Sequence, residues 1–363
     1  MFSKSSLIII LAQLVLVSYQ FNLNSYMDTV KLLLNDLQFQ QQFQDHINTF
    51  LELDPNYFNF TSNSKFDCNV NQGAPATSVH NLRPNDVKVI AALGDSLTAS
   101  LGTKAKTVVG LLTENREVSW SIGGEANLDS VVTLPNIIKK YNSQLFGYST
   151  ECSFVLTSKT GVGLNAAVSG QEANHMADQA ATIVKRLKES DKIDFQNDWK
   201  VVTLFIGGND LCDYCKDKSL HSPQTYTGDI QEALDILHRE LPRTFVNLVN
   251  VINVGPVEEL NIGICSLLHK SECPCAAFPN SDDDRKELQE FFQGYSQLTE
   301  ALVASGRYDT RDDFTVVFQP FFRDFKPPRT NDGKIDISYF APDCFHFSVK
   351  SQGKFNFAGL ELE

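Results

Sequence analysis

The sequence predicts an α/β fold, a mostly parallel sheet with helices on both faces. From about residue 86 onward, apolar segments of strand length alternate with longer segments whose apolar residues repeat with helical spacing. Glycine-containing polar motifs follow several of the strand segments, at the edge where parallel sheets carry their ligands. The chain has 363 residues, of which 42% are apolar and 21% charged, so a large core is possible.

Residues 1–20 have the layout of a secretory signal peptide. Lys4 supplies a positive charge, and the apolar segment 7–17 that follows is short for a membrane span. The alternative is an uncleaved anchor at the same place. We therefore expect a protein that is secreted, or that resides in the lumen of the secretory or endolysosomal pathway, without a further transmembrane anchor.

Residues 21–85 are predicted to form a helical preamble, that is, a helical N-terminal segment, followed by a linker. One domain is predicted over residues 86–363. Leucine, phenylalanine and glutamine are frequent, with helix-like spacing, from residue 24 to about residue 53, and a polar stretch with proline and glycine follows. The glycosylation sequon at Asn59 begins within that polar stretch.

Net charge and cysteine content indicate which partners and which kind of cysteine site to expect. The net charge is −13, which argues against nucleic acid as a partner. The cysteines are even in number and follow a signal peptide, so they predict structural disulfides whose connectivity stays open. The spacings Cys212-x-x-Cys215 and Cys273-x-Cys275 also occur in zinc and redox sites, which are the alternative. The eight cysteines are Cys68, Cys152, Cys212, Cys215, Cys265, Cys273, Cys275 and Cys344.

The first strand segment of the domain, residues 89–93, leads to a serine. Gly94, Asp95 and Ser96 follow it, and a helix is expected to begin there. A hydroxyl at the carboxyl end of a strand, beside a backbone N–H at a helix N-terminus, fits a nucleophile next to an oxyanion donor. The alternative is that Asp95 or Ser96 only caps the helix, because Asp and Ser are preferred capping residues.

Strand-like and helix-like segments continue to alternate after this serine. Their lengths and apolar spacing predict strands at 118–124, 153–157, 201–206, 245–254 and 314–319. The same reasoning predicts helices at 134–141, 171–188, 229–239 and 283–304.

Three later motifs also fall at the ends of predicted elements. Gly170 precedes a helix, where its backbone N–H can approach a ligand without a side chain in the way. Asn209 and Asp210 follow a buried strand, so an amide and a carboxylate reach the same edge of the sheet. Asp343 lies three residues before His346, a spacing that lets the acid bind one ring nitrogen while the other faces the serine.

Together these motifs resemble the four signature blocks of the GDSL, or SGNH, lipases and esterases. The blocks are Gly94-Asp95-Ser96-Leu97, Gly170, Gly207-Gly208-Asn209 and Asp343-x-x-His346. The resemblance is to the phospholipase B branch in particular, in residues 89–98, 204–212, 305–311 and 340–348 of a match over about residues 64–348. It implies a three-layer αβα, flavodoxin-like domain whose sheet has about five strands.

The resemblance also implies ester hydrolysis, on glycerophospholipids and lysophospholipids, without a metal or an organic cofactor. Ser96 would be the nucleophile, His346 the general base and Asp343 the acid that orients the histidine. The backbone N–H groups of Ser96 and Gly170, with the side-chain amide of Asn209, would form the oxyanion hole. The expected partners are the lipid substrate and a membrane or micelle surface that is contacted transiently.

A second carboxylate keeps the choice of acid open. Asp210 lies in a signature block and is an alternative or supporting acid, although the spacing to His346 favours Asp343. The other six histidines have no comparable neighbours in the sequence. His175 and His238 fall within predicted helices, where we expect packing or surface positions.

Two other functions fit the same sequence. A GDSL esterase acting on acetylated carbohydrates or other small esters would use the same chemistry with a different pocket. A catalytically weak, lipid-binding homologue would keep the fold without turnover. The second is suggested by residues 347–363, which are short for the helix that normally closes the family domain, through either a shortened helix or a truncated chain. The Phe-rich segment 318–325 fits an acyl-chain groove or plain core packing.

Overall fold

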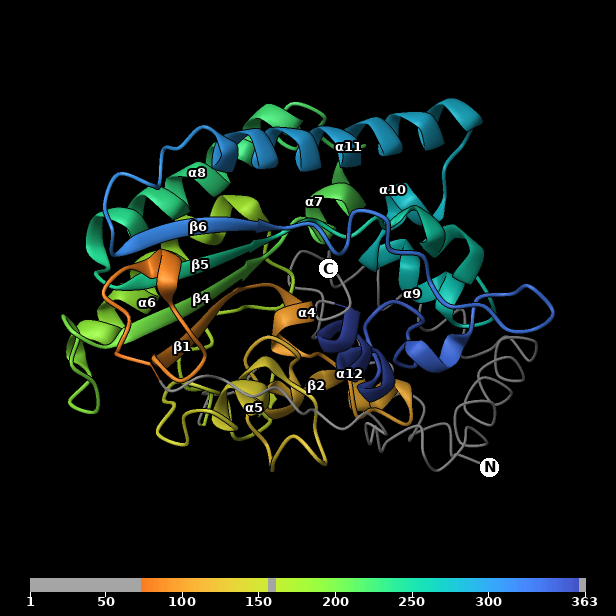
Figure 1. The fold of residues 1–363 in the computed structure, drawn as a ribbon. Coiled ribbons are helices and arrows are strands. Elements are labelled where there is room, and N and C mark those ends of the chain that lie inside the picture. The colour runs from red at the N-terminus through yellow and green to blue at the C-terminus, as the bar shows by residue number, and fades with distance from the viewer. Residues whose placement is uncertain (1–72, 156–160, 359–363) are drawn as a thin grey trace.

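The structure is a computed structural model, and it describes residues 73–155 and 161–358 (Figure 1). The predicted signal peptide, the helical preamble, the sequon at Asn59 and Cys68 lie outside the described residues.

A four-stranded parallel sheet forms the centre of the domain, in the spatial order β1-β4-β5-β6. The strands are mostly apolar, as expected for parallel strands that are covered on both faces. Their bounds are β1 (Val87–Gly94), β4 (Trp199–Phe205), β5 (Thr244–Val249) and β6 (Phe314–Gln319).

Strand β1 shows why both faces of the sheet need a cover. Val89 and Leu93 belong to the larger hydrophobic core, whereas Ile90 and Ala92 belong to a smaller one. Successive side chains of a strand point to opposite faces, so the two cores lie on the two sides of the sheet. The result is the three-layer αβα arrangement that the family resemblance implied.

Helices provide both outer layers. Those of the described residues are α4 (Ser96–Ala99), α5 (Leu134–Lys139), α6 (Met176–Glu189), α7 (Gly208–Asp213), α8 (Pro223–Glu240), α9 (Cys265–Glu272), α10 (Pro274–Ala277), α11 (Asp282–Ala304) and α12 (Val349–Ala358). Residues of α6, α8 and α11 line the larger core, and Ile138 of α5 lines the smaller one. Figure 1 shows α8 and α11 on one side of the molecule and α5 on the opposite side.

Helix caps explain where the two longest helices begin. Ser222 Oγ accepts a hydrogen bond from Thr225 N, and Pro223 is the first residue of α8. Helix α8 therefore begins six residues before the predicted start at 229, which rested on apolar spacing alone. Ser281 caps α11 in the same way. Three aspartates in the first turn of α11 interact favourably with the positive end of the helix dipole.

The structure differs from the prediction at residues 118–124, where no strand forms. Gly123 N donates to Ser119 O over 2.7 Å, and a Cβ on Gly123 would lie 2.5 Å from Glu117 O. A chain that turns back this tightly cannot be extended. The main sheet of the described residues accordingly has four strands, where about five were predicted.

Short elements complete the connections. The predicted strand at 153–157 is reduced to β3 (Ser153–Phe154), which pairs antiparallel with β2 (Thr113–Glu114). The 3₁₀ helices are η2 (Val79–Asn81), η3 (Val108–Leu112), η4 (Arg116–Val118), η5 (Ala173–His175), η6 (Gly255–Leu260) and η7 (Ile337–Tyr339).

Three disulfides connect the segment of α7 to the segment of α9 and α10, and α9 to the loop that carries Asp343. The cysteines of the two closely spaced pairs bond across to each other and not within a pair, which is the structural role predicted and not a zinc or redox site. The bonds are Cys212–Cys273, Cys215–Cys275 and Cys265–Cys344. Cys152 is exposed and has no disulfide partner among the described residues.

The C-terminal helix α12 is ten residues long and is held against the rest of the domain. Gln352 Oε1 accepts from Trp120 N over 2.9 Å, and Ser351 Oγ donates to the carbonyl oxygen of Tyr339. Across residues 73–155 and 161–358, no helix is both long enough and apolar enough to cross a bilayer.

Candidate active site

The strands of the sheet run toward α4 and α7, which stand at their carboxyl ends (Figure 1). At the turn after β1, a Cβ on Gly94 would lie 2.4 Å from the carbonyl oxygen of Phe205, so the turn requires glycine. Asp95 caps α4, because its Oδ1 accepts from Leu97 N over 2.8 Å. The capping role thus falls to Asp95, and the hydroxyl of Ser96 is left for another partner.

That partner is His346, and Asp343 completes a hydrogen-bonded row. His346 Nε2 lies 2.8 Å from Ser96 Oγ, and His346 Nδ1 lies 2.7 Å from Asp343 Oδ2. The carboxylate can only accept, so these bonds place the ring proton on Nδ1 and leave the lone pair of Nε2 facing the hydroxyl. All three residues are buried. A row of this kind lets a histidine take the proton of a serine.

The second oxygen of Asp343 orders the loop that carries the histidine. Asp343 Oδ1 accepts from the backbone N–H groups of Phe345 and His346, each over 3.0 Å. Burial alone would raise the pKa of Asp343, but attraction to His346 and these hydrogen bonds outweigh it and hold that pKa below its ordinary value. The acid is therefore ionised and ready to orient the imidazole.

Asp95 has the opposite shift. Burial raises the pKa of Asp95 to about 6, although the Leu97 N–H and the charge of His346 act in the other direction. A carboxyl group next to Ser96 in the sequence therefore titrates at mildly acidic pH.

Asp210 lies away from the histidine. Both of its carboxylate oxygens accept from Ala173 N, each over 3.2 Å, and none of its hydrogen bonds within the described residues reaches His346. Burial, followed by the charge of Glu172, raises the pKa of Asp210 well above its ordinary value. The structure brings Asp343, and not Asp210, to the ring nitrogen.

The predicted oxyanion donors lie around the same edge. Val168 N donates to Gly94 O over 3.2 Å, which holds the loop before Gly170 beside the turn that carries Ser96. Within the described residues, the backbone N–H groups of Ser96 and Gly170 donate to no other group. Gly170 has a φ of 81°, and a Cβ there would meet nothing within 4 Å. Both amides are thus available to a ligand.

Asn209 lies in the first turn of α7 and supports the same loop. Its Nδ2 donates to the carbonyl oxygen of Gln171 over 2.8 Å, next to Gly170 in the chain. Because an amide nitrogen carries two hydrogens, the second N–H can still serve a ligand.

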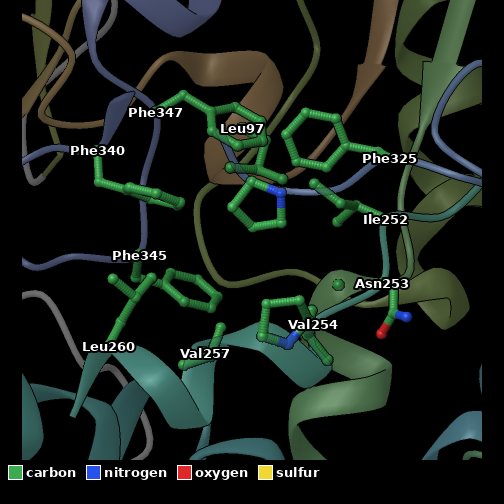
Figure 2. Close-up of a pocket in the computed structure, with 13 residues that line it drawn as sticks. Leu97, Ile252, Asn253, Val254, Val257, Leu260, Phe325, Phe340, Phe345 and Phe347 are labelled. Atoms are coloured by element: carbon green, nitrogen blue, oxygen red, sulfur yellow. The ribbon is translucent and has the colours of Figure 1, made fainter. Parts of the chain in front are cut away.

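An apolar pocket opens beside the row (Figure 2). It has an empty volume of about 480 Å³ including its mouth, and it includes Leu97, which follows Ser96, and Phe345 and Phe347, which flank His346. Figure 2 shows the rings of Phe325 and Phe340 across the cavity from Val254 and Val257. Its polar residue Asn253 uses its side chain on Gln289 and Gly255 N, so the walls offer mainly apolar surface.

The Phe-rich segment 318–325 contributes both to the core and to the wall of the apolar pocket. Phe325 lines the pocket. Phe322 is fully buried and stacks on Phe205 of β4 with ring centroids 4.9 Å apart. The segment therefore joins the core to the pocket wall.

Sequence reasoning missed a buried histidine behind Asp343. His269 Nε2 lies 2.9 Å from the carbonyl oxygen of Asp343, a spatial contact that its neighbours in the sequence do not indicate. Its partner is 74 positions away, and no local pattern signals the contact. His238 packs as expected, since its ring meets Phe314 at 4.9 Å. No group of three or more potential metal ligands occurs among the described residues.

The sequence is similar to that of known proteins. Residues 90–356 match the family model described as GDSL-like Lipase/Acylhydrolase. "Phospholipase B1, membrane-associated" of Homo sapiens is 46% identical over 285 residues, which cover 77% of this chain and 19% of that protein. The protein of the same name from Rattus norvegicus is 43% identical over 308 residues, covering 82% and 21%. The chain thus spans about a fifth of the length of these relatives. The chain belongs to the GDSL-like lipases and acylhydrolases, and within them it is similar to the phospholipase B1 proteins.

Proposed function

We propose that this chain is a serine esterase that hydrolyses the acyl esters of glycerophospholipids and lysophospholipids. One observation carries the proposal: the row of Ser96, His346 and Asp343 stands directly beside an apolar pocket that its own sequence neighbours line. The row supplies the chemistry of ester hydrolysis, and the pocket supplies a place for a hydrocarbon chain.

The first half of the reaction forms an acyl-enzyme. Ser96 Oγ attacks the ester carbonyl carbon while His346 Nε2 takes the hydroxyl proton, and Asp343 stabilises the imidazolium. The carbonyl π electrons move onto oxygen, where the N–H groups of Ser96 and Gly170 and the amide of Asn209 receive them. The carbon–oxygen bond to the leaving alcohol then breaks, and His346 returns the proton to that alcohol.

The second half repeats these steps with water. His346 takes a proton from water, the hydroxide attacks the acyl carbon, and Ser96 leaves with the proton that the histidine returns. The products are a fatty acid and a lysophospholipid or, from a lysophospholipid, a fatty acid and the deacylated glycerophosphodiester.

The pocket supports long acyl chains over the small-ester alternative. Burial of each methylene group contributes about 0.8 kcal/mol, so an acyl chain gains binding energy in an apolar cavity that an acetyl group cannot use. The relatives from human and rat are named as phospholipases, which agrees with a lipid substrate. No feature of the described residues specifically favours an acetylated sugar.

Contact with a lipid surface and passage through the secretory route belong to the same proposal. Asn261, which follows the pocket residue Leu260, donates to the carbonyl of Ala277. The residues that follow these two in the chain, Ile262 and Phe278, are 46% and 36% exposed. Such side chains suit transient contact with a membrane or micelle.

The disulfides support an oxidising compartment. Mass spectrometry of protein released by expressing cells should find a chain without residues 1–20, and retention of that segment contradicts secretion by cleavage.

The decisive experiment incubates the purified protein with a defined phosphatidylcholine and follows fatty acid, lysophospholipid and glycerophosphocholine by mass spectrometry. We expect all three products from the native protein and none from a folded Ser96→Ala variant. Rapid hydrolysis of acetylated sugars without turnover of phospholipid would shift the assignment to the small-ester alternative.

A further inference from the structure

We infer that the buried ion pair of Glu114 and Arg116 positions the oxyanion loop, residues 167–170, and that Ser169 is the residue through which it acts. The inference deepens the proposed function and rests on it, because an oxyanion loop has a role only in a reaction that passes through a tetrahedral intermediate. Ser169 is a positioning residue here, since it acts on the backbone N–H of Gly170 and touches no reacting atom.

The pair is costly to bury, which calls for an explanation. The side chains of Glu114 and Arg116 are both 0% exposed, and Arg116 Nη2 lies 2.8 Å from Glu114 Oε2. Removing two charges from water costs several kcal/mol per ion, and their mutual attraction offsets this only with good geometry and further hydrogen bonds. Well-packed apolar side chains could fill the same space at no loss of stability. The contacts of the pair indicate what it does instead.

Two of these contacts reach the loop directly before Gly170. Ser169 Oγ donates to Glu114 Oε1 over 2.8 Å, and Arg116 Nη2 donates to the carbonyl oxygen of Ala167 over 2.8 Å. Glu114 thus binds Ser169 of the loop, and Arg116 binds Ala167, which lies two positions earlier. Hydrogen bonds to charged groups contribute about twice as much as those between neutral groups. The backbone leading into Gly170 is thereby fixed at two points.

Ser153 of β3 also bonds to both charges, and neighbouring hydrogen bonds connect this region to the helix that carries the nucleophile. The residue between the two charges, Asn115, donates its N–H to the carbonyl oxygen of Ser100 over 2.9 Å, at the C-cap of α4. On the loop side, Asn165 Oδ1 accepts from Ala167 N over 3.0 Å, and Asn165 Nδ2 donates to Thr98 O over 3.4 Å. The loop and α4 are therefore both connected to the region of the buried Glu114–Arg116 ion pair.

Gly170 needs such support because its outer side is open. The residue is exposed, and a Cβ at that position would meet nothing within 4 Å. An oxyanion donor must stand about 2.7–3.1 Å from the developing negative oxygen, and a shift of ~1 Å can cost on the order of a hundredfold in rate. With no packing on its outer side, the loop depends on the contacts behind it, and Glu114 and Arg116 provide two of them.

The test compares Ser169→Ala with Ser169→Thr and with Ser149→Ala. Ser169→Ala removes the bond to Glu114 but leaves the ion pair whole, so the variant should fold. Ser169→Thr keeps a hydroxyl. Ser149→Ala is the matched control, because Ser149 Oγ also makes one hydrogen bond, 2.8 Å to Val162 O, outside the site. Each protein is assayed with p-nitrophenyl butyrate and with phosphatidylcholine.

The inhibition constant of a trifluoromethyl ketone separates a positioning role from a purely structural one. Ser96 Oγ bonds to its carbonyl carbon, the π electrons become an oxyanion, and His346 keeps the serine proton, so its affinity reports on the oxyanion hole. For Ser169→Ala we expect kcat to fall by about tenfold to about a hundredfold, short of the ~10²–10³ that loss of a whole donor costs. The inhibition constant should rise by the same factor, with KM within about twofold. Ser169→Thr and Ser149→Ala should stay within about twofold of the native protein.

Four outcomes would contradict the inference or its basis. Native kcat and inhibition in Ser169→Ala would overturn the positioning role, and so would an equal loss in Ser149→Ala. Hydrolysis of p-nitrophenyl butyrate but not of phosphatidylcholine by the native protein would overturn the proposed substrate class alone. Absence of any ester hydrolysis would overturn both proposals.

Discussion

Asp343 binds His346 at two points, through the ring and through the backbone. Oδ2 lies 2.7 Å from the ring Nδ1, and Oδ1 accepts from the backbone N–H of the same residue over 3.0 Å. One carboxylate thus sets both the place of the histidine and the direction of its ring. Asp343 is itself held from behind, because its carbonyl oxygen lies 2.9 Å from His269 Nε2 and the next residue is bonded to Cys265.

This double contact leads to a comparison of the two candidate acids. We expect Asp343→Asn to lower kcat by about 10⁴-fold, as in a serine protease whose triad acid is amidated, because the amide favours the wrong imidazole tautomer. Asp210→Asn should cost less than about tenfold. The raised pKa of Asp210 already favours its neutral form, and an amide oxygen can still accept from Ala173 N. A greater loss in Asp210→Asn would assign the triad acid to Asp210.

The nucleophile can be tested without a lipid. Ser96→Ala should abolish covalent labelling by a fluorophosphonate and lower ester hydrolysis by about 10⁴-fold or more. The thermal midpoint should change little, because Asp95 provides the helix cap. Labelling of the variant at native rate would place the reactive serine elsewhere in the chain.

Asp95 makes stability depend on pH in a direction that can be calculated. Its pKa in the folded protein is about 6, above the ordinary value of 3.8, so the folded state binds this proton more tightly than the unfolded state. The contribution is complete below about pH 4 and is lost as pH rises through about 6. At about 1.4 kcal/mol per pKa unit, it amounts to about 3 kcal/mol.

Asp95→Asn isolates this effect, because asparagine caps helices equally well and does not titrate. The variant should gain stability relative to the native protein between pH 4.5 and pH 7.5, by about 2–3 kcal/mol in urea unfolding. Parallel pH profiles for the two proteins would show that Asp95 titrates normally.

Gly208 offers a way to shorten the pocket without a clash. It lines the cavity, and a Cβ there would meet nothing within 4 Å. If Gly208→Leu excludes two methylene groups of the substrate, it costs about 1.6 kcal/mol of binding, so the ratio of long-chain to butyryl ester hydrolysis should fall by roughly tenfold. Gly228→Leu is the control, because its Cβ also meets nothing within 4 Å but the residue lies on α8, away from the pocket lining. An unchanged chain-length ratio in Gly208→Leu would argue against this cavity as the acyl site.

The disulfides should differ in their effect on turnover. Replacing Cys265 and Cys344 by serine removes the bond beside Asp343, and we expect a loss of ~2–4 kcal/mol in stability together with at least about tenfold in kcat. Replacing Cys215 and Cys275 should lower the stability by a similar amount, because this bond spans 60 residues and the Cys265–Cys344 bond spans 79. The effect on kcat should be smaller. Equal kcat in the two double variants would show that the bond at Cys344 does not order the catalytic loop.

Much of the fold could be predicted because it depends on local patterns. Strands β1, β4 and β6 and helix α11 match their predicted segments closely. A strand buried on both faces leaves a continuous apolar run in the sequence, and a helix buried on one face leaves apolar residues at helical spacing. Ser96 could be found because it follows the end of a strand, and Asp343 and His346 because their spacing suits an acid and its histidine. The turn at 118–124 was mistaken for a strand because its apolar residues serve core packing from an irregular backbone, as Trp120 does against Phe205.

The supports of the site could not be predicted in the same way. Ser169 meets Glu114 across 55 positions, and His269 meets Asp343 across 74. A buried charge has the same letter in the sequence as a solvated one, and the usual expectation for Glu and Arg is exposure. Only the folded chain shows that Glu114 and Arg116 are at 0% exposure.

The pattern of cross-links has a consequence for a chain that is cut. A protease that cleaves any one peptide bond between Cys212 and Cys344 leaves at least one disulfide spanning the cut, because the three bonds overlap along the sequence. Ser96 would then sit in one fragment and His346 in the other, yet the two fragments would migrate as a single species until a reductant is added. A nicked form of this protein can therefore remain one molecule with its serine and histidine still joined.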